Sequence, residues 1–433
     1  LEVAHTDNLT KLSNRNHFQQ VLKQNIDDAS ESQEKVILLH VDVNNFKRIN
    51  DSFGYEVGDQ LLIQMAQRLK GLVSDSCHVA RVGGDEFVIT LNAKEPGAEV
   101  LLGENIHTSS QKSFVIDNHI VNVKLSIGVV MYPDHAKNSE EMIKHADYAV
   151  NMAKHKDGVR TQYFTQEVAA QIERKVLIAK LLGNAIEFSL LSLKFQPIFC
   201  INSGEVKSVE VLCRWNNPEL GVVSPDEFIP VAEETGLIHN LGTWVLKETI
   251  KCIKLLPGRK PIKAAVNFSA HQLNNPALVE QYLNEIRQSY VDPALFTFEI
   301  TESMLIDNLE LGSEILNNIS DLGCDISIDD FGTGYSSLQY LKHLPIKNLK
   351  IDKGFVNGIS NDDSDLNIVE AIISLAKSMD MNVIAEGVEH KEQVDILQGL
   401  GCDLMQGYYF AKPLPFEELL DLVKSQGQLK SVK

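Results

Sequence analysis

Short apolar runs alternate with helical stretches along the second half of this chain, and this pattern limits the folds that the half can adopt. In each unit an apolar run is followed by polar residues and then by a stretch with helical spacing. The runs are Val209–Leu212, Lys263–Phe268, Phe296–Ile300, Asp325–Ile328, Leu349–Ile351, Asn382–Ala385 and Leu404–Tyr408. Such alternation over about 240 residues predicts a (β/α)8 barrel of the TIM type.

Polar residues lie within or just after these predicted strands. They are Glu210, Asn267, Glu299, Asp329, Asp330, Lys350, Glu386 and Gln406. Because the carboxyl ends of barrel strands converge on one mouth, we expect these side chains to share one site. A single acid after a strand is as often a helix cap as a ligand, but capping does not explain the whole set.

A cluster of carboxylates needs cations, because like charges a few ångströms apart repel. Oxygen ligands without a clustered set of His or Cys favour Mg²⁺ or Mn²⁺ over zinc. Adjacent acids such as Asp329 and Asp330 can serve two ions about 3.5–4 Å apart, the spacing used in phosphodiester displacement. Lys350 can orient the attacking water or balance charge on the phosphorus. The barrel is therefore predicted to be a metal-dependent phosphodiesterase.

The first half has a second acidic pattern. Asp42 ends the apolar run Val36–Val43, and Gly83-Gly84-Asp85-Glu86 joins two further apolar runs as a β-hairpin. If these elements are neighbours, Asp42 and Asp85 can hold a metal ion against a triphosphate.

Composition excludes several classes of protein. The formal net charge of -19 argues against binding to nucleic acid. The six cysteines are scattered and form no C-x-x-C pair, which predicts a reducing, cytoplasmic location. No apolar run of about 18 residues appears. Because residue 1 is Leu, we expect a fragment whose upstream sensory or membrane segment is missing.

The second half resembles an EAL-domain cyclic di-GMP phosphodiesterase. The matching pieces follow in family order: Phe195–Ile198, Glu210–Trp215, Asn267–Ser269, Glu299–Glu302, Asp329–Gly334, Lys350–Asp352, Glu386–Glu389 and Gln406–Tyr408. The product implied by the resemblance is linear pGpG, and the cofactors implied are two Mg²⁺ or Mn²⁺ ions.

The resemblance also implies a role for individual residues of the barrel. One metal ion would be held by Glu210, Asn267, Glu299 and Asp329. The second would be held by Asp329, Asp330 and Glu386. Lys350 would orient the attacking water, and Glu302 would brace the loop of Asp329, so that Lys350, Glu302 and Glu210 form the expected catalytic set. The substrate would be held by Gln196, Arg214 and Gln406.

The first half resembles a GGDEF diguanylate cyclase domain, from Asp7-Asn8-Leu9-Thr10 to the helix Asp147–Lys154. The fold implied is an α+β, palm-like domain with a mostly antiparallel central sheet. The resemblance implies Mg²⁺ bound by Asp42, the carbonyl of Val43 and Asp85. It implies GTP contacts from Asn50, Asp59, Glu86 and Lys154. Such cyclases join two GTP molecules across a homodimer of two half-sites.

Three positions depart from the GGDEF pattern. The product-inhibition motif R-x-x-D is replaced by Ser-Asp-Ser-Cys at Ser74–Cys77. Asn151 stands where the family has Tyr, and Gly158 comes one residue late. These departures favour GTP binding over fast synthesis.

We therefore expect a GGDEF domain at residues 1–165, a linker helix region at 166–190 and an EAL domain at 191–433. The preferred hypothesis is a cyclic di-GMP phosphodiesterase modulated by GTP binding at the first domain. One alternative is a bifunctional enzyme that also makes cyclic di-GMP. Another is a non-catalytic receptor for cyclic di-GMP, although receptors of that kind usually lose metal ligands and the expected ligands are all present here.

Overall fold

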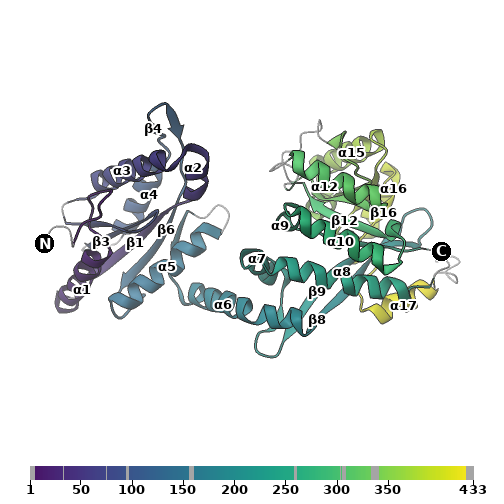
Figure 1. The fold of residues 1–433 in the computed structure, drawn as a ribbon, viewed down its shortest axis with the longest axis horizontal. Coiled ribbons are helices and arrows are strands. Elements are labelled where there is room, and N and C mark those ends of the chain that lie inside the picture. The colour runs from purple at the N-terminus through teal and green to yellow at the C-terminus, as the bar shows by residue number, and fades with distance from the viewer. Residues whose placement is uncertain are drawn as a thin grey trace. The chain divides into compact units, whose positions relative to one another are not determined.

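The chain forms two compact units, residues 1–174 and 175–433 (Figure 1). The computed structural model describes residues 5–32, 34–74, 76–93, 97–155, 160–257, 261–302, 304, 309–332 and 341–425. Within these ranges no helix combines the length and the hydropathy needed to span a bilayer. The predicted domain boundaries at 165 and 190 stay predictions.

The first unit is built around a sheet of five strands in the order β2-β3-β1-β6-β7. Its elements are α1 (Arg15–Ser32), β1 (Lys35–Val43), α2 (Phe46–Phe53), α3 (Tyr55–Leu72), β2 (His78–Gly83), β3 (Glu86–Ala93), α4 (Ala98–Ser110), β4 (Phe114–Ile116), β5 (His119–Val121), β6 (Leu125–Tyr132), α5 (Ser139–His155) and β7 (Thr161–Tyr163). The central strand β1 is antiparallel to β3 and β6, whereas β6 and β7 are parallel. The predicted, mostly antiparallel sheet is confirmed.

Strand β1 is buried on both faces, so its alternating side chains enter two different cores. Ile37 and Val41 belong to the core on one face. Leu38 belongs to the core on the other face, with Phe18 of α1. Asp42 has the same parity as Leu38, and its side chain therefore faces the side of the sheet that α1 and α5 cover.

Helix α5 lies very close to strand β6 at Gly128. A Cβ atom placed on Gly128 would lie 2.6 Å from the carbonyl oxygen of Ala146 and would also contact the backbone nitrogen of Val150. Because any side chain here would push the helix away, glycine sets the distance between α5 and the sheet. The long helix α6 (Gln166–Glu187) follows β7.

The second unit contains a closed barrel. Its elements are β8 (Leu191–Cys200), β9 (Val206–Asn217), β10 (Gly221–Val223), α7 (Pro225–Glu234), α8 (Ile238–Leu255), β11 (Lys263–Asn267), α9 (Ala270–Leu273), α10 (Pro276–Ser289), the 3-10 helix η2 (Pro293–Leu295), β12 (Phe296–Thr301), α12 (Leu309–Leu322), β13 (Asp325–Phe331), β14 (Asn348–Ile351), α14 (Lys353–Gly358), α15 (Asp363–Ser378), β15 (Asn382–Ala385), α16 (Lys391–Leu400), β16 (Leu404–Met405) and α17 (Phe416–Ser425).

The barrel runs in the order β9-β11-β12-β13-β14-β15-β16-β8, and β8 closes it by pairing with β9. The strands from β9 to β16 are parallel to their neighbours, which confirms the TIM-type prediction. Strand β8 is antiparallel to both of its neighbours. The reason is local: a tight turn around Gly204, which has φ 66, joins β8 to β9, and a parallel connection needs a dozen residues or more.

Candidate functional sites

Lys350 lies at the centre of the barrel, and its side chain has 0% exposure. Strand β14 carries it, and the neighbouring strands bring four carboxylates to its ammonium group. Its Nζ lies 2.6 Å from Oε1 of Glu386, 3.1 Å from Oε1 of Glu299, 3.1 Å from Oδ1 of Asp329 and 3.8 Å from Oε2 of Glu210. The predicted convergence of strand ends on one site is therefore seen for these residues.

One ammonium group cannot neutralise four carboxylates, and the pKa values reflect this. Burial alone would lower the pKa of Lys350, but the surrounding carboxylates outweigh it and raise that pKa well above its ordinary value. Burial raises the pKa of Glu299 well above its usual range, and burial raises the pKa of Glu386 to about 8. Without cations the site therefore retains protons at neutral pH.

Two amides hold the carboxylate of Glu210. Asn267 Nδ2 donates a hydrogen bond of 3.0 Å to Oε1, and Gln406 Nε2 donates one of 2.6 Å to Oε2. Burial would raise the pKa of Glu210, but Lys350 and these two donors lower it. Gln406 lies just past β16, which ends at Met405 and not at Tyr408 as predicted. These bonds keep Glu210 ionised and fixed in the barrel.

Asp329, Asp330 and Glu386 form the group best placed to hold a metal ion. One oxygen atom from each lies within 4.8 Å of the others, the one such group among the described residues. The pairing of β13 with β14 is irregular between Ile328 and Phe331, and Asp330 has φ 52. At this bulge the two adjacent acids depart from the pattern of a regular strand, in which successive side chains point to opposite faces. Burial raises the pKa of Asp330 to about 6, with contributions from the charges of nearby acids.

Asp352 is a residue of this site to which the sequence analysis gave no role, although it ends the matched piece Lys350–Asp352. Its charge and its hydrogen bond raise the pKa of Asp330, so the two carboxyl groups lie side by side. Asp352 also caps α14, where its Oδ1 accepts a hydrogen bond of 2.8 Å from the backbone nitrogen of Gly354. The available signal was an acid two residues after Lys350, directly past the strand.

Glu302 supports the loop that follows β13. Its Oε2 accepts a hydrogen bond of 3.0 Å from the backbone nitrogen of Gly332, which has φ 102. Glu302 is only 3% exposed. This contact fits its predicted role as a brace. The last two residues of the matched motif, Thr333 and Gly334, lie outside the described residues.

The donor set of the barrel fits hard divalent cations. Both carboxylate oxygens of Glu299 are buried without a hydrogen bond among the described residues, although Lys350 lies nearby. Buried charged oxygens are costly unless a cation or a donor compensates them. The nearby ligand atoms are all carboxylate or amide oxygens, which Mg²⁺, Mn²⁺ and Ca²⁺ prefer.

The residues predicted to hold the substrate lie around this acidic centre. Gln196 on β8 pairs with Glu210 on β9, and its Nε2 donates a bond of 3.5 Å to the carbonyl of Ala411. Arg214 and Asn267 line a mostly apolar cavity of about 490 Å³. The described lining of this cavity includes none of the carboxylates around Lys350, so the cavity touches the acidic centre only through Asn267 and does not by itself mark a substrate site.

The first unit has a smaller acidic site at the end of β1. Asp42 is 1% exposed, and its Oδ2 lies 2.6 Å from Nζ of Lys154 on α5. Burial raises the pKa of Asp42, although Lys154 opposes this. The backbone nitrogen of Val43 bonds to the carbonyl of Asp85 at 3.3 Å, and Asp42 pairs with Glu86 across the sheet. The structure thus brings together the predicted metal ligands and Lys154.

Two of the residues predicted to contact GTP, Asn50 and Asp59, lie on α2 and α3. The side chain of Asn50 lies against Gly58, which precedes the exposed Asp59. Oδ1 of Asn50 is buried and accepts no hydrogen bond among the described residues. Asn50 thus lies against the residue that precedes Asp59, and the predicted GTP contacts of both residues stay predictions. Gly158 lies outside the described residues.

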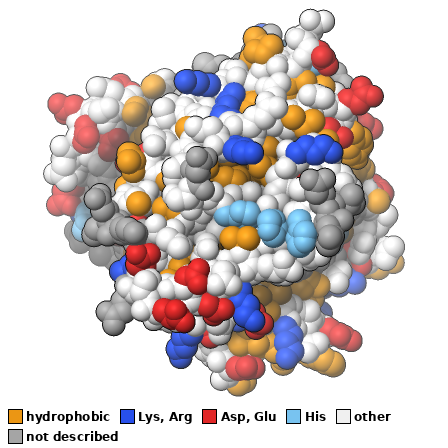
Figure 2. Space-filling model, turned by 90° about the vertical axis from the view of Figure 1, so that its left-hand side faces the viewer, with side chains coloured by type: hydrophobic (Ala, Val, Ile, Leu, Met, Phe, Trp, Pro, Cys, Tyr) orange, Lys and Arg blue, Asp and Glu red, His pale blue; other side chains and the backbone are white. Residues whose placement is uncertain are grey.

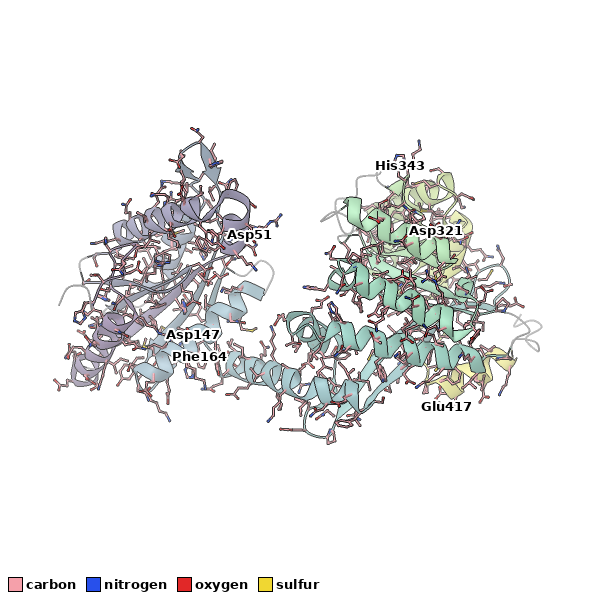
Figure 3. All side chains as sticks on the ribbon, in the orientation of Figure 1. Asp51, Asp147, Phe164, Asp321, His343 and Glu417 are labelled. Carbon is pink, nitrogen blue, oxygen red and sulfur yellow. The ribbon has the colours of Figure 1, made fainter. Side chains whose placement is uncertain are left out.

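His40 was not predicted. Its Nδ1 lies 2.9 Å from Oδ1 of Asp147, which projects from α5 (Figure 3). His40 is 4% exposed, and with Lys154 and Asn151 it lines a cavity of about 280 Å³. Only its even spacing from Asp42 along β1 could have placed it on this face.

Comparison with protein families decides the classification. Residues 180–413 match the model of the EAL domain. The chain belongs to the EAL domain family. Residues 4–160, ahead of this EAL domain, match the model described as diguanylate cyclase, GGDEF domain. The chain is thus a tandem of the two domains that its motifs indicated.

Curated relatives align with this chain over nearly its whole length. The bifunctional diguanylate cyclase/cyclic di-GMP phosphodiesterase MucR of Pseudomonas aeruginosa is 37% identical over 97% of this chain and 62% of its own length. The cyclic di-GMP phosphodiesterase PdeR of Escherichia coli is 35% identical over 95% of this chain and 62% of its own length. The chain thus spans less than two thirds of these relatives.

Solved structures agree with the EAL assignment. The MucR phosphodiesterase in complex with cyclic di-GMP is 40% identical, covers 56% of this chain and 99% of that chain, and has a TM-score of 0.54. The GGDEF–EAL portion of Vibrio cholerae LapD is 20% identical over 94% of this chain and 96% of that chain, with a TM-score of 0.63. The second comparison supports the fold.

Proposed function

We propose that the barrel hydrolyses cyclic di-GMP to linear pGpG. The observation that carries this proposal is the convergence of four carboxylates on Lys350, with Asp329, Asp330 and Glu386 spaced to hold a metal ion. The names of the relatives, which include cyclic di-GMP phosphodiesterases, support the same substrate.

The barrel residues would hold two divalent cations. Because the ligand atoms are oxygens, these cations would be Mg²⁺ or Mn²⁺. The first would be held by Glu210, Asn267, Glu299 and Asp329, and the second by Asp329, Asp330 and Glu386. When bound, such ions stabilise negative charge on phosphate oxygens and lower the pKa of water.

The residues of the chain then have separate tasks. With the carboxylates neutralised, the ammonium group of Lys350 donates to the attacking water and orients it toward phosphorus. Glu302 holds the loop of Asp329 and Asp330 in place through Gly332. Gln196, Arg214 and Gln406 hold the dinucleotide. Water adds to phosphorus, one P–O3′ bond breaks, and the freed 3′ oxygen takes up a proton.

The test is turnover of cyclic di-GMP by the purified chain with Mg²⁺ or Mn²⁺, followed by chromatography of pGpG. Glu210→Ala should lower the rate by at least about 100-fold, because a ligand that positions the water is lost. Glu219→Ala is the matched control, since Glu219 is an exposed acid near the same strand, and it should leave turnover unchanged. Absence of pGpG with either metal would overturn the proposal. Tight binding without turnover would favour the receptor alternative.

We further propose that the first unit binds Mg²⁺·GTP and that GTP binding modulates the barrel. The proximity of Asp42, Asp85 and Lys154 supports this. Turnover of cyclic di-GMP should therefore change when GTP is added, and Asp42→Asn should abolish the change. The same rate with and without GTP would contradict this modulation.

A bifunctional enzyme is the second candidate, favoured by the same acids and by the printed name of MucR. It would act as a homodimer, because two GTP molecules must meet. Incubating Glu210→Ala with GTP alone tests it, since any cyclic di-GMP formed then persists. If no cyclic product forms, the cyclase alternative fails.

We place this activity in the cytoplasm, a proposal that the six free cysteines support. The predicted upstream sensory or membrane segment stays a prediction.

A further inference from the structure

Three histidines gather in the first unit, away from Asp42 and Lys154. Figure 2 shows histidine side chains side by side in the middle of one face, with Lys or Arg side chains nearby. The ring centroids of His5 and His17 lie 4.8 Å apart, and those of His17 and His78 lie 5.3 Å apart. These residues come from a turn, from α1 and from β2, so the fold alone brings them together.

The turn that carries His5 is tied to the strand that carries His78. Ser13 forms a bridge with Ala80 of β2, and the backbone nitrogen of Arg81 donates to the carbonyl of Ser13 at 2.9 Å. The backbone nitrogen of Asn14 donates to the carbonyl of His5 at 3.0 Å. The three imidazoles are therefore held near one another by backbone contacts, whatever their own interactions.

Two of the imidazoles have a buried nitrogen with nothing to bind. Nδ1 of His5 and Nε2 of His78 are buried and have no hydrogen-bond partner among the described residues. A buried polar atom left unpaired destabilises the fold, so a ligand that pairs with it is favoured. Burial, with the nearby His17, lowers the pKa of His78, which keeps its imidazole neutral. Neutral imidazole is the form that binds metal ions.

The third imidazole is already oriented. Nδ1 of His17 lies 3.0 Å from Oγ of Ser13, which leaves Nε2 available. A hydrogen bond to the other ring nitrogen is the usual support of a metal-binding histidine.

The two ring spacings, of His17 to His5 and of His17 to His78, are short enough for a shared ion. With metal–nitrogen bonds of about 2.0–2.1 Å in a tetrahedral site, two imidazole centroids lie about 5 Å apart. In the present arrangement the acids around Asp329 are the one group of described residues with all ligand atoms within 4.8 Å. The imidazoles must therefore turn about χ2 for their nitrogens to converge on one ion.

A cavity of about 610 Å³ gives access to the cluster. Its described wall contains His5, Thr6, Lys11, Leu12, Ser13, His17, Lys70, Val73, Ser74, Cys77, His78 and Val79. Lys11 and Lys70 are exposed, so water screens their charges. The wall includes Ser74 and Cys77, the ends of the stretch that replaces the family's product-inhibition motif.

We propose that His5, His17 and His78 form a binding site for one borderline divalent transition-metal ion such as Zn²⁺. Three neutral nitrogen ligands suit Zn²⁺ and not Mg²⁺, so the site differs in chemistry from the oxygen ligands of the barrel. An ion bound here ties the N-terminal turn and α1 to β2. Strand β2 leads directly to the turn that contains Asp85, which makes the site a point of control over the first unit.

The experiment measures Zn²⁺ binding to the purified chain by competition with a chromogenic chelator, with excess Mg²⁺ present to occupy the carboxylates. We expect one Zn²⁺ per chain in the micromolar range or tighter, weakened at least 10-fold by His17→Ala and by His78→Ala. His119→Ala is the matched control, because His119 lies beside Phe53 with ring centroids 5.3 Å apart and outside the cavity.

A second readout separates loss of the ligand from loss of the fold. Zn²⁺ should raise the thermal midpoint of the wild-type chain and of His119→Ala, since an ion that binds the folded state stabilises it. It should not raise the midpoint of His17→Ala, whose midpoint without metal should match the wild type within a few degrees. Absence of tight Zn²⁺ binding, or equal binding by both histidine variants and the wild type, would overturn the proposal. Neither result bears on hydrolysis by the barrel.

Discussion

Nζ of Lys350 lies 2.6 Å from Oε1 of Glu386, in a barrel interior that leaves the lysine side chain 0% exposed. A buried ammonium group is stable only where negative charge compensates it. Here the ammonium group of Lys350 and the surrounding carboxylates compensate each other's charge. Removing either partner should therefore change the stability of the fold as well as turnover.

Replacing Lys350 by Met should destabilise the metal-free protein. The change removes the fully buried ammonium group that is paired with these carboxylates. Breaking a buried ion pair costs about 3–5 kcal/mol. Urea unfolding in the presence of a chelator measures the effect. Lys347→Met is the control, because Lys347 is exposed, and it should change the free energy of unfolding by less than about 0.5 kcal/mol. Equal stability of both variants would refute this account.

The stability of the metal-free barrel should fall as the pH rises toward 8. The folded-state pKa of Glu386, about 8, lies above its ordinary value of 4.5, so between these values the folded state binds more protons than the unfolded state. The contribution of Glu386 is thus present below pH 4.5 and is lost as the pH rises through about 8. Denaturant unfolding in a chelator at several pH values measures it. A free energy of unfolding that increases between pH 4.5 and about 8 would contradict the raised pKa of Glu386.

Affinity for Mg²⁺ should rise over the same range. Protons compete with the ion for Glu386 and for Asp330, whose pKa is about 6. Titration calorimetry at pH 6 and pH 8 should show weaker binding and more proton release at pH 6. The same titration of the Glu386→Gln variant should show much less of this pH dependence.

Glu302→Ala should lower turnover by about 10–100-fold, the usual effect of losing a group that orients metal ligands. The variant leaves the backbone nitrogen of Gly332 without its acceptor. Glu302→Gln retains an oxygen that can accept this bond, and it should recover most of the activity. The measurements are kcat and the affinity for Mg²⁺. If both variants lose the same amount of activity, the charge of Glu302 and not its hydrogen bond to Gly332 is what turnover requires.

Gly128→Ala should destabilise the first unit by about 1–3 kcal/mol, the usual cost of overpacking. The added methyl group would lie 2.6 Å from the carbonyl of Ala146. Gly71→Ala is the matched control: it lies in helix α3 with nothing within 4 Å of the added atom, and it should stabilise by about 0.5–1 kcal/mol. Thermal unfolding of both variants makes the comparison.

Much of the barrel and its acids could be predicted because strand spacing and ligand chemistry are local properties of sequence. Glu210, Glu299 and Lys350 each lie within a predicted strand, and the rule that barrel strands converge on one mouth places them together. The reversed direction of β8 was not predicted, because alternation does not specify strand direction. The turn at Gly204 was its only local sign.

Other parts depend on contacts between distant residues. Asp352 reads equally well as a helix cap, and it is one. His5, His17 and His78 are spread over three elements, so no spacing rule groups them. The contact between His40 and Asp147 joins β1 to α5, more than 100 residues later in the chain. Such contacts follow from packing and not from local pattern.

Because Lys350 is part of strand β14, its ammonium group comes to lie among the carboxylates as soon as the strands of the barrel pair. Folding of this unit therefore delivers one counter-ion to the acids from within the chain itself. Ions that bind there must still displace protons, for example from Glu386, whose pKa is about 8. The proposed hydrolysis thus depends on the acidity of the surroundings as well as on the supply of metal.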